Sequence, residues 1–150
     1  MEKGKIIYLN GVSGTGKTTL SNTLQERANE PFYWVASDMF CSCIVDIVHT
    51  QPEIKILAES IKQLHEYPVL FVHVTCPSDE LYRRKTKRGD PEVDKWLPYQ
   101  FENFAPKEPY DITVDTHINT VEECADKILE LLNYPEKFTA FKTLWAQRTE

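Results

Sequence analysis

One short segment near the N-terminus limits the possible folds of this chain more than any other. Residues 11–18 read Gly-Val-Ser-Gly-Thr-Gly-Lys-Thr, which matches the pattern G-x-x-x-x-G-K-[ST] in full. An apolar run over residues 5–10 precedes the pattern, and leucines spaced four residues apart, Leu20 and Leu24, follow it. A strand, a glycine-rich turn and a helix in this order form a phosphate-binding loop. The segment therefore predicts an α/β fold with a nucleoside triphosphate site.

Each residue type in this loop has a chemical reason. Glycines let the backbone fold around an anion, and the following helix directs the positive end of its dipole at the phosphates. Lys17 supplies a charge for the β and γ phosphates, and the Thr18 hydroxyl can ligand Mg²⁺. The residues that we expect to bind ATP are Gly11, Ser13, Gly14, Thr15, Gly16, Lys17, Thr18 and Thr19. The alternative, a glycine-rich turn without a ligand, leaves the complete pattern unexplained.

Composition narrows the class of protein further. The chain has 150 residues, of which 41% are hydrophobic and 27% charged, so we expect a single globular domain over residues 1–150. Its net charge of −6 argues against broad nucleic-acid binding, which depends on neutralising phosphates. The sequence contains neither a membrane-spanning run nor a signal peptide, so we expect a cytoplasmic protein with reduced thiols. The four cysteines are interpreted as small buried hydrophobes rather than as a zinc site.

The rest of the chain alternates between strand and helix patterns, which predicts a parallel sheet covered by helices. Strands are predicted over residues 5–10, 32–36, 69–75 and 111–115. Helices are predicted over residues 17–28, 40–48, 53–66, 81–89 and 121–132. Ser78 is the expected N-cap of the fourth helix, and a capping box from Thr120 to Glu123 is expected for the fifth.

Two segments are less regular. Residues 91–109 contain four prolines and are interpreted as loop, with one short helix as an option. Residues 133–150 form a C-terminal extension with an amphipathic helix, whose apolar positions include Phe141 and Leu144. We expect this extension to cover the sheet. The alternative is that its apolar face contacts a second copy in a homo-oligomer.

Asp38 is the first candidate for a group that acts on an acceptor molecule. It follows the predicted strand over residues 32–36, and ligands of open α/β sheets bind outside the carboxyl ends of the strands. Its carboxylate could accept the proton of an attacking hydroxyl or reach Mg²⁺. The alternative is an N-cap for the helix that follows.

A basic cluster over residues 83–88 stands out in this acidic chain. Arg84 and Arg88 are four residues apart and so share one face of a helix. Two cations over a transferring phosphoryl group would stabilise its charge, and Gly89 could serve as a hinge for a mobile lid. Lys85 and Lys87 are interpreted as solvated charges.

Several segments in order resemble one known family, the chloramphenicol phosphotransferase-like P-loop kinases. The resemblance covers roughly residues 5–132. Its segments are Ile6 to Thr18, Val35 to Asp38, Leu70 to Pro77, Arg84 to Asp90, Gln100, Tyr110 to Thr116, and Glu122 to Ala125. The resemblance implies a nucleotide-kinase sheet and ATP-dependent phosphorylation of a small-molecule hydroxyl, with Asp38 as the base.

The chain also departs from the family. Pro91 and Ala105 stand where the family usually has an arginine and often a histidine. Residues 39–68 contain no apolar strand, whereas family members place there a strand that lies beside the P-loop strand and carries a carboxylate toward Mg²⁺. We therefore expect a sheet that lacks one family strand. This loss keeps two alternatives open: a non-catalytic nucleotide-binding module and a nucleoside or polynucleotide 5′-end kinase.

Overall fold

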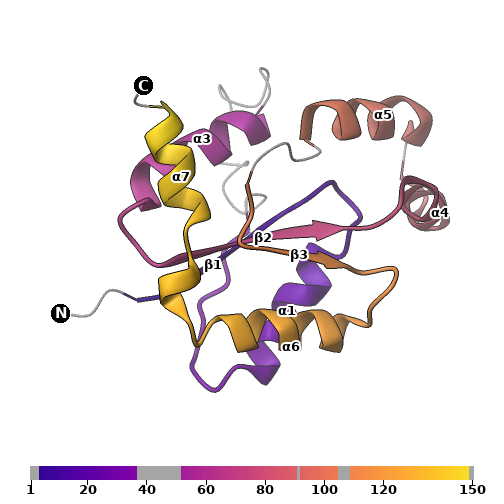
Figure 1. Cartoon of the computed structure of the whole chain (residues 1–150). Helices are drawn as coiled ribbons and strands as arrows, with labels where there is room; N and C mark the ends of the chain where they lie inside the picture. Colours follow the sequence, from indigo (N-terminus) through magenta and orange to yellow (C-terminus); the bar gives the residue numbers. More distant parts are fainter. Residues whose placement is uncertain (1–3, 37–51, 91, 105–108, 149–150) are drawn as a thin grey trace.

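The computed structural model describes residues 4–36, 52–90, 92–104 and 109–148 (Figure 1). Its strands are β1 (Ile6–Asn10), β2 (Val69–Thr75) and β3 (Ile112–Asp115). Its helices are α1 (Lys17–Arg27), α3 (Pro52–Leu64), α4 (Ser78–Arg88), α5 (Val93–Phe104), α6 (Val121–Leu131), the 3₁₀ helix η1 (Pro135–Lys137) and α7 (Ala140–Arg148). The three strands form a parallel sheet in the order β1-β2-β3. The predicted α/β class, a parallel sheet flanked by helices, is confirmed.

Helices cover both faces of the sheet (Figure 1). Successive side chains of a strand point to opposite faces, so β2 contributes to two apolar clusters. Leu70, Val72 and Val74 pack with α1 and α6, while Val69 and Phe71 pack with α3 and α7. A strand that is buried on both faces has a nearly continuous apolar sequence, and the sequence of β2 is of this kind.

The C-terminal extension belongs to this core. Phe141 and Leu144 of α7 are each 2% exposed, and the Phe141 ring meets Phe71 of β2 edge to face with centroids 5.0 Å apart. Edge-to-face contacts of this kind add to the burial of apolar area. The expectation that the extension covers the sheet is confirmed.

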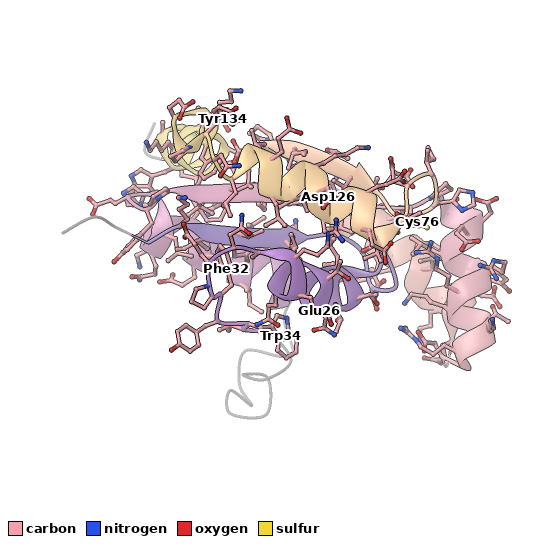
Figure 2. The ribbon with its side chains drawn as sticks, turned by 90° about the horizontal axis from the view of Figure 1, so that it is seen from below. Glu26, Phe32, Trp34, Cys76, Asp126 and Tyr134 are labelled. Carbon is pink, nitrogen blue, oxygen red and sulfur yellow. The ribbon has the colours of Figure 1, made fainter. Side chains whose placement is uncertain are left out.

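The strand predicted over residues 32–36 is wrong. These residues are coil, with Tyr33 fully exposed and Val35 65% exposed. In Figure 2 the segment that carries Phe32 and Trp34 lies outside the three strands. A strand needs a neighbour for its backbone hydrogen bonds. Within the described ranges no such neighbour exists for this segment.

The outer edge of β1 shows where the missing family strand would lie. The Ile6 N–H donates to the Pro68 carbonyl oxygen on the β2 side at 3.0 Å. Because a parallel ladder alternates, the backbone groups of Ile7 and Leu9 face the opposite side. Among the described residues no strand pairs with that side of β1. Within the described ranges the P-loop strand is therefore an edge strand, which agrees with the expectation from the shortened sequence.

Two further predictions need correction, and one cannot be compared. Residues 93–104 form a twelve-residue helix despite Pro98, because Val93, Leu97 and Phe101 at i, i+4 and i+8 pack on one apolar cluster. The N-cap of α4 is Pro77 rather than Ser78, and it makes no side-chain capping bond. The helix predicted over residues 40–48 lies outside the described residues. None of the helices that the structure describes is long and apolar enough to cross a membrane.

Candidate nucleotide and phosphoryl-transfer site

The P-loop begins directly after β1, where the chain at Gly11 passes close to β2. A β-carbon on Gly11 would lie 2.1 Å from the Val74 carbonyl oxygen, so a larger residue would force the two strands apart. Gly14 and Gly16 have φ angles of 92° and 94°, in the left-handed region that glycine adopts without strain. The three glycines thus let the chain leave β1, turn, and enter α1.

The N-terminus of α1 is suited to an anion. No side chain caps it, and its first turn contains no acidic residue. Lys17 lies at this end and donates from Nζ to the carbonyl oxygens of Gly11 (2.6 Å) and Val12 (3.1 Å), which holds its charge against the loop. Ser13, Thr18 and Thr19 are exposed beside it. Backbone N–H groups, a lysine and hydroxyls are a donor set that fits the phosphates and metal ion of a nucleoside triphosphate.

Thr116, which directly follows β3, connects the loop to the basic helix. Its Oγ1 donates to the Thr15 carbonyl oxygen at 2.7 Å and accepts from Arg84 Nη1 at 3.0 Å. Arg84 Nη2 also donates to the Thr116 carbonyl oxygen at 3.0 Å. Thr15 is 1% exposed, so its carbonyl depends on protein partners. Thr116 therefore fixes the P-loop and the Arg84 guanidinium relative to each other.

The basic helix α4 is held by acidic partners. Arg84 Nε donates to Glu80 at 2.7 Å, and Arg83 pairs with the same carboxylate. These two guanidinium groups hold the pKa of Glu80 at about 2, below its ordinary 4.5. Arg88 pairs with Asp90 across the turn at Gly89, where the helix ends as predicted.

The interpretation of Lys85 as a solvated charge is wrong. Lys85 is 6% exposed, and its aliphatic stem lies against the position that a Gly14 β-carbon would take. Its Nζ lies 3.9 Å from the Asp90 carboxylate. Burial lowers the pKa of this lysine. Lys87 is exposed, as predicted.

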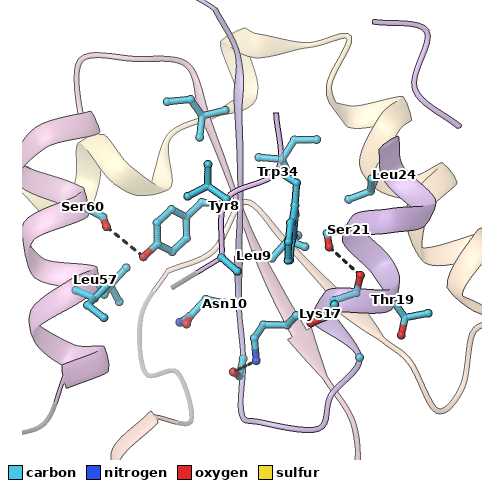
Figure 3. A pocket seen from close by; sticks show the side chains of 18 of the residues that line it. Tyr8, Leu9, Asn10, Lys17, Thr19, Ser21, Leu24, Trp34, Leu57 and Ser60 are labelled. Atoms are coloured by element: carbon cyan, nitrogen blue, oxygen red, sulfur yellow. Dashed lines mark hydrogen bonds between the residues drawn. The ribbon is translucent and has the colours of Figure 1, made fainter. Parts of the chain in front are cut away.

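One cavity of about 1820 Å³ brings most of the predicted site residues together. It extends along the open edge of β1 to the P-loop (Figure 3). Its walls include Gly11, Ser13, Gly14, Gly16, Lys17, Thr18, Thr19, Arg84 and Arg88. Figure 3 shows Lys17 and Asn10 on this cavity, with Leu57 and Ser60 of α3 on one side and Trp34 on the other. Thr15 lies in the loop but is buried, and Asp38 lies outside the described residues.

The sequence analysis did not identify Asn10 as a site residue, although its polar side chain lies at the carboxyl end of β1. Asn10 ends β1, and its Nδ2 donates to the Tyr110 hydroxyl at 2.8 Å. The Tyr110 ring lies over Phe71 (centroids 4.3 Å apart) and stacks on His73 (4.9 Å). Burial lowers the pKa of His73. The sequence did contain a signal for both Asn10 and Thr116, because each stands at the carboxyl end of a strand, where ligands of α/β sheets bind.

Two of the four cysteines, Cys76 and Cys124, are described by the structure, and neither lines the cavity. Cys76 and Cys124 are buried free thiols, and burial raises the pKa of each. Their predicted role as buried hydrophobes is confirmed, whereas Cys41 and Cys43 lie outside the described residues. Within the described ranges no group of three or more His, Cys, Asp or Glu side chains is placed to hold a metal ion.

The sheet, the complete P-loop and the covering helices together define a P-loop α/β fold of the nucleotide-kinase type. The chain belongs to the chloramphenicol phosphotransferase-like family, which matches it over residues 4–45 and 41–133. The two matched stretches overlap over residues 41–45, close to where the family strand is expected to be absent.

Solved structures agree on the fold. One is described as the crystal structure of APE1195, with a TM-score of 0.58, 21% sequence identity, and coverage of 89% of this chain and 97% of that one. Another is the Mycobacterium tuberculosis APS kinase CysC in complex with AMPPNP and APS, with a TM-score of 0.53, 15% identity, and coverage of 89% and 99%. A search of curated proteins found no match.

Proposed function

We propose that this protein is an ATP-dependent phosphotransferase that moves the γ-phosphoryl group to a hydroxyl of a small molecule. The observation that carries the proposal is that the P-loop, Lys17, Thr18 and the basic helix α4 line one cavity. Phosphoryl transfer depends mainly on positioning and on stabilising charge, and these groups supply both.

Each group has a separate role in the proposed reaction. The loop amides and Lys17 bind the phosphates, and Thr18 contributes a hydroxyl to Mg²⁺, which would neutralise phosphate charge when bound. The acceptor oxygen forms a bond to the γ phosphorus while the bond from that phosphorus to the ADP oxygen breaks. Asp38 takes the proton of the acceptor hydroxyl. Arg88, at the cavity wall, stabilises the charge on the transferring group.

The contacts of Arg84 suggest a role different from that of Arg88. The Arg84 guanidinium is fixed by Glu80 and by both oxygens of Thr116. We therefore assign Arg84 to holding the P-loop and α4 in register as well as to charge stabilisation. Arg88 is more exposed, at 58% of its side chain, and within the described residues its ion-pair partner is Asp90.

The direct test is phosphoryl transfer with chloramphenicol as the first acceptor, since the family suggests it. ADP release and mass spectrometry of the acceptor should show one added phosphate per turnover. Lys17→Ala should abolish transfer, and Asp38→Asn should slow it by about 10²–10⁴-fold, the usual contribution of a general base. Lys62→Ala, on the exposed side of α3, is the matched control and should leave the rate unchanged. If Asp38→Asn is as fast as the parent protein, Asp38 is not the base.

A non-catalytic nucleotide-binding module is the second candidate, because β1 has an open edge in the described structure. It predicts binding of Mg·ATP without transfer to any acceptor in a broad panel. Transfer that requires Lys17 would exclude it.

A nucleoside or polynucleotide 5′-end kinase is a third candidate function, and the net charge of −6 argues against a polynucleotide substrate. Retention on a labelled oligonucleotide at physiological salt would revive it.

A further inference from the structure

The strand β1 is apolar but incompletely buried. Its sequence, Ile-Ile-Tyr-Leu-Asn, contains neither a charge nor a proline, yet each of its five residues is partly exposed. The neighbouring strand β2 is buried at five of its seven positions. The two strands differ because β2 lies between two strands, whereas β1 has one strand neighbour within the described ranges. Exposed edge strands usually carry a charge or a proline that blocks further pairing, and β1 has no such protection.

The backbone of this edge specifies what can bind to it. In β1 the N–H and C=O groups of Ile6 and Tyr8 point toward β2, and those of Ile7 and Leu9 point the other way. In the part of the chain that the structure describes, no strand exchanges hydrogen bonds with Ile7 and Leu9. Two donors and two acceptors on alternate residues match the backbone of an extended polypeptide.

The walls of the cavity define the side chains that such a polypeptide needs. Leu57 and Leu64 of α3 line the cavity on one face of the sheet, and Leu24 of α1 and Trp34 line it on the other (Figure 3). The two apolar clusters of the core are therefore both open at the edge of β1. Successive residues of a strand point to opposite faces, so the occupant must be apolar at consecutive positions to extend both clusters.

The cavity has room for one more strand beside β1. A five-residue strand takes about 17 Å along its axis, about 4.8 Å between neighbouring strands and about 10 Å between the covering layers, which is about 800 Å³. The cavity has about 1820 Å³ and includes the space in front of the P-loop as well. Because α3 and Trp34 flank the edge on its two faces, the β1 edge of a second copy would bring the same flanking elements against them. A single extended segment fits this space better than a second covered sheet.

We propose that the open edge of β1 is a docking site for an extended apolar segment of another polypeptide, which adds a fourth strand to the sheet. The occupant supplies about five consecutive apolar residues, the length of β1. It pairs through its backbone with Ile7 and Leu9 and packs its side chains on α3 and on Trp34. In complexes of this kind the backbone hydrogen bonds give affinity and the side-chain pockets give specificity. The inference concerns the sheet edge and is independent of the reaction that the P-loop serves.

The test uses a synthetic peptide with the sequence of residues 69–75, flanked at each end by two lysines for solubility. This sequence already pairs with the other edge of β1 and is largely apolar on both faces. Amide hydrogen exchange, resolved by NMR, should be fast at Ile7 and Leu9 in the free protein and slow at Ile6 and Tyr8. At a peptide concentration of about ten times the Kd, exchange at Ile7 and Leu9 should slow about 10-fold, because about one molecule in eleven remains free.

Two controls separate strand pairing from unspecific adhesion. The same peptide with methylated backbone nitrogens keeps its side chains but cannot donate hydrogen bonds, so it should not protect Ile7 and Leu9. Trp34→Ala should weaken peptide binding by about 10-fold or more, because it removes an aromatic wall of the groove. Tyr134→Ala removes an aromatic side chain of similar exposure outside the cavity and should leave binding unchanged.

Several results would overturn the proposal. Slow exchange at Ile7 and Leu9 in the isolated monomer would mean that the chain covers its own edge. Slow exchange that appears only in a dimer, identified by light scattering, would mean that a second copy covers it. Failure of the peptide to bind, or equal protection by the methylated peptide, would mean that the edge does not recognise a strand.

Discussion

Thr116→Val tests whether the P-loop and the basic helix are held together by one hydroxyl. Valine has nearly the same shape, so the change removes the hydroxyl and little else. The buried Thr15 carbonyl would lose a donor at 2.7 Å, and Arg84 would lose one of its acceptors at 3.0 Å. The first loss costs about 1–3 kcal/mol and the second about 0.5–1.5 kcal/mol, since the partly exposed Arg84 keeps its other partners. The expected fall in the free energy of unfolding is about 1.5–4.5 kcal/mol.

The assay is urea unfolding of Thr116→Val beside the parent protein and a matched control. Thr113→Val is that control, because Thr113 is an exposed residue of β3 whose side chain makes no hydrogen bond within the described residues. The control should change the free energy of unfolding by less than about 0.5 kcal/mol. Mg·ATP binding to Thr116→Val should also weaken, because the loop loses its link to Arg84. A free energy within about 0.5 kcal/mol of the parent value would refute the reasoning.

Three more predictions follow from the structure. Gly11→Ala, whose β-carbon would meet the Val74 carbonyl oxygen at 2.1 Å, should unfold the protein or cost more than about 3 kcal/mol by urea titration, whereas Gly4→Ala, with nothing within 4 Å, should be neutral. Glu80 has a lowered pKa of about 2, so its ion pairs stabilise the protein above pH 4.5 and this stability is lost as the pH falls toward 2. The difference in unfolding free energy between Glu80→Gln and the parent should shrink over that range, and a constant difference would contradict the assignment. Phe141→Ala should lower the unfolding free energy by about 3–5 kcal/mol, and a change below 1 kcal/mol would show that α7 is not part of the core.

Local patterns predicted the parts of the fold that depend on neighbours along the chain. The P-loop motif placed β1, the turn and α1 correctly, because its glycines and its helix start are dictated by backbone geometry. The capping box at Thr120 is present, since both of its hydrogen bonds are made within four residues. The continuous apolar run of β2 indicated a strand buried on both faces, and the structure has one.

The wrong predictions concern residues whose secondary structure or exposure depends on contacts with residues far away in the sequence. Residues 32–36 have strand propensity, but within the described residues no strand lies beside them to pair with. The prolines in and near α5 favoured a loop in the sequence analysis, whereas tertiary packing stabilises a twelve-residue helix there. Lys85 looked like one charge in a basic run, yet its stem packs on Gly14 and its amine faces Asp90. No local pattern reports contacts of this kind.

The candidate site was predictable where a motif defines it and not elsewhere. Lys17 and Thr18 follow from the P-loop, and the structure puts both on the cavity that Arg84 and Arg88 also line. The hydrogen bond from Asn10 to the Tyr110 hydroxyl joins residues that lie far apart in the sequence. It depends on how the chain packs, so sequence spacing could not reveal it.

The measurement that tests the central claim most directly is calorimetric titration of Mg·ATP into the purified protein, with Lys17→Ala and the surface control Lys62→Ala alongside. The account predicts clear binding to the parent protein and to Lys62→Ala, and affinity at least about 10- to 100-fold weaker for Lys17→Ala, the loss expected when a charged hydrogen-bond partner of phosphate is removed. Melting curves of the three proteins confirm that they are folded. If the folded parent protein does not bind Mg·ATP, or if Lys17→Ala binds it equally well, the P-loop is not a nucleotide site and the account is contradicted.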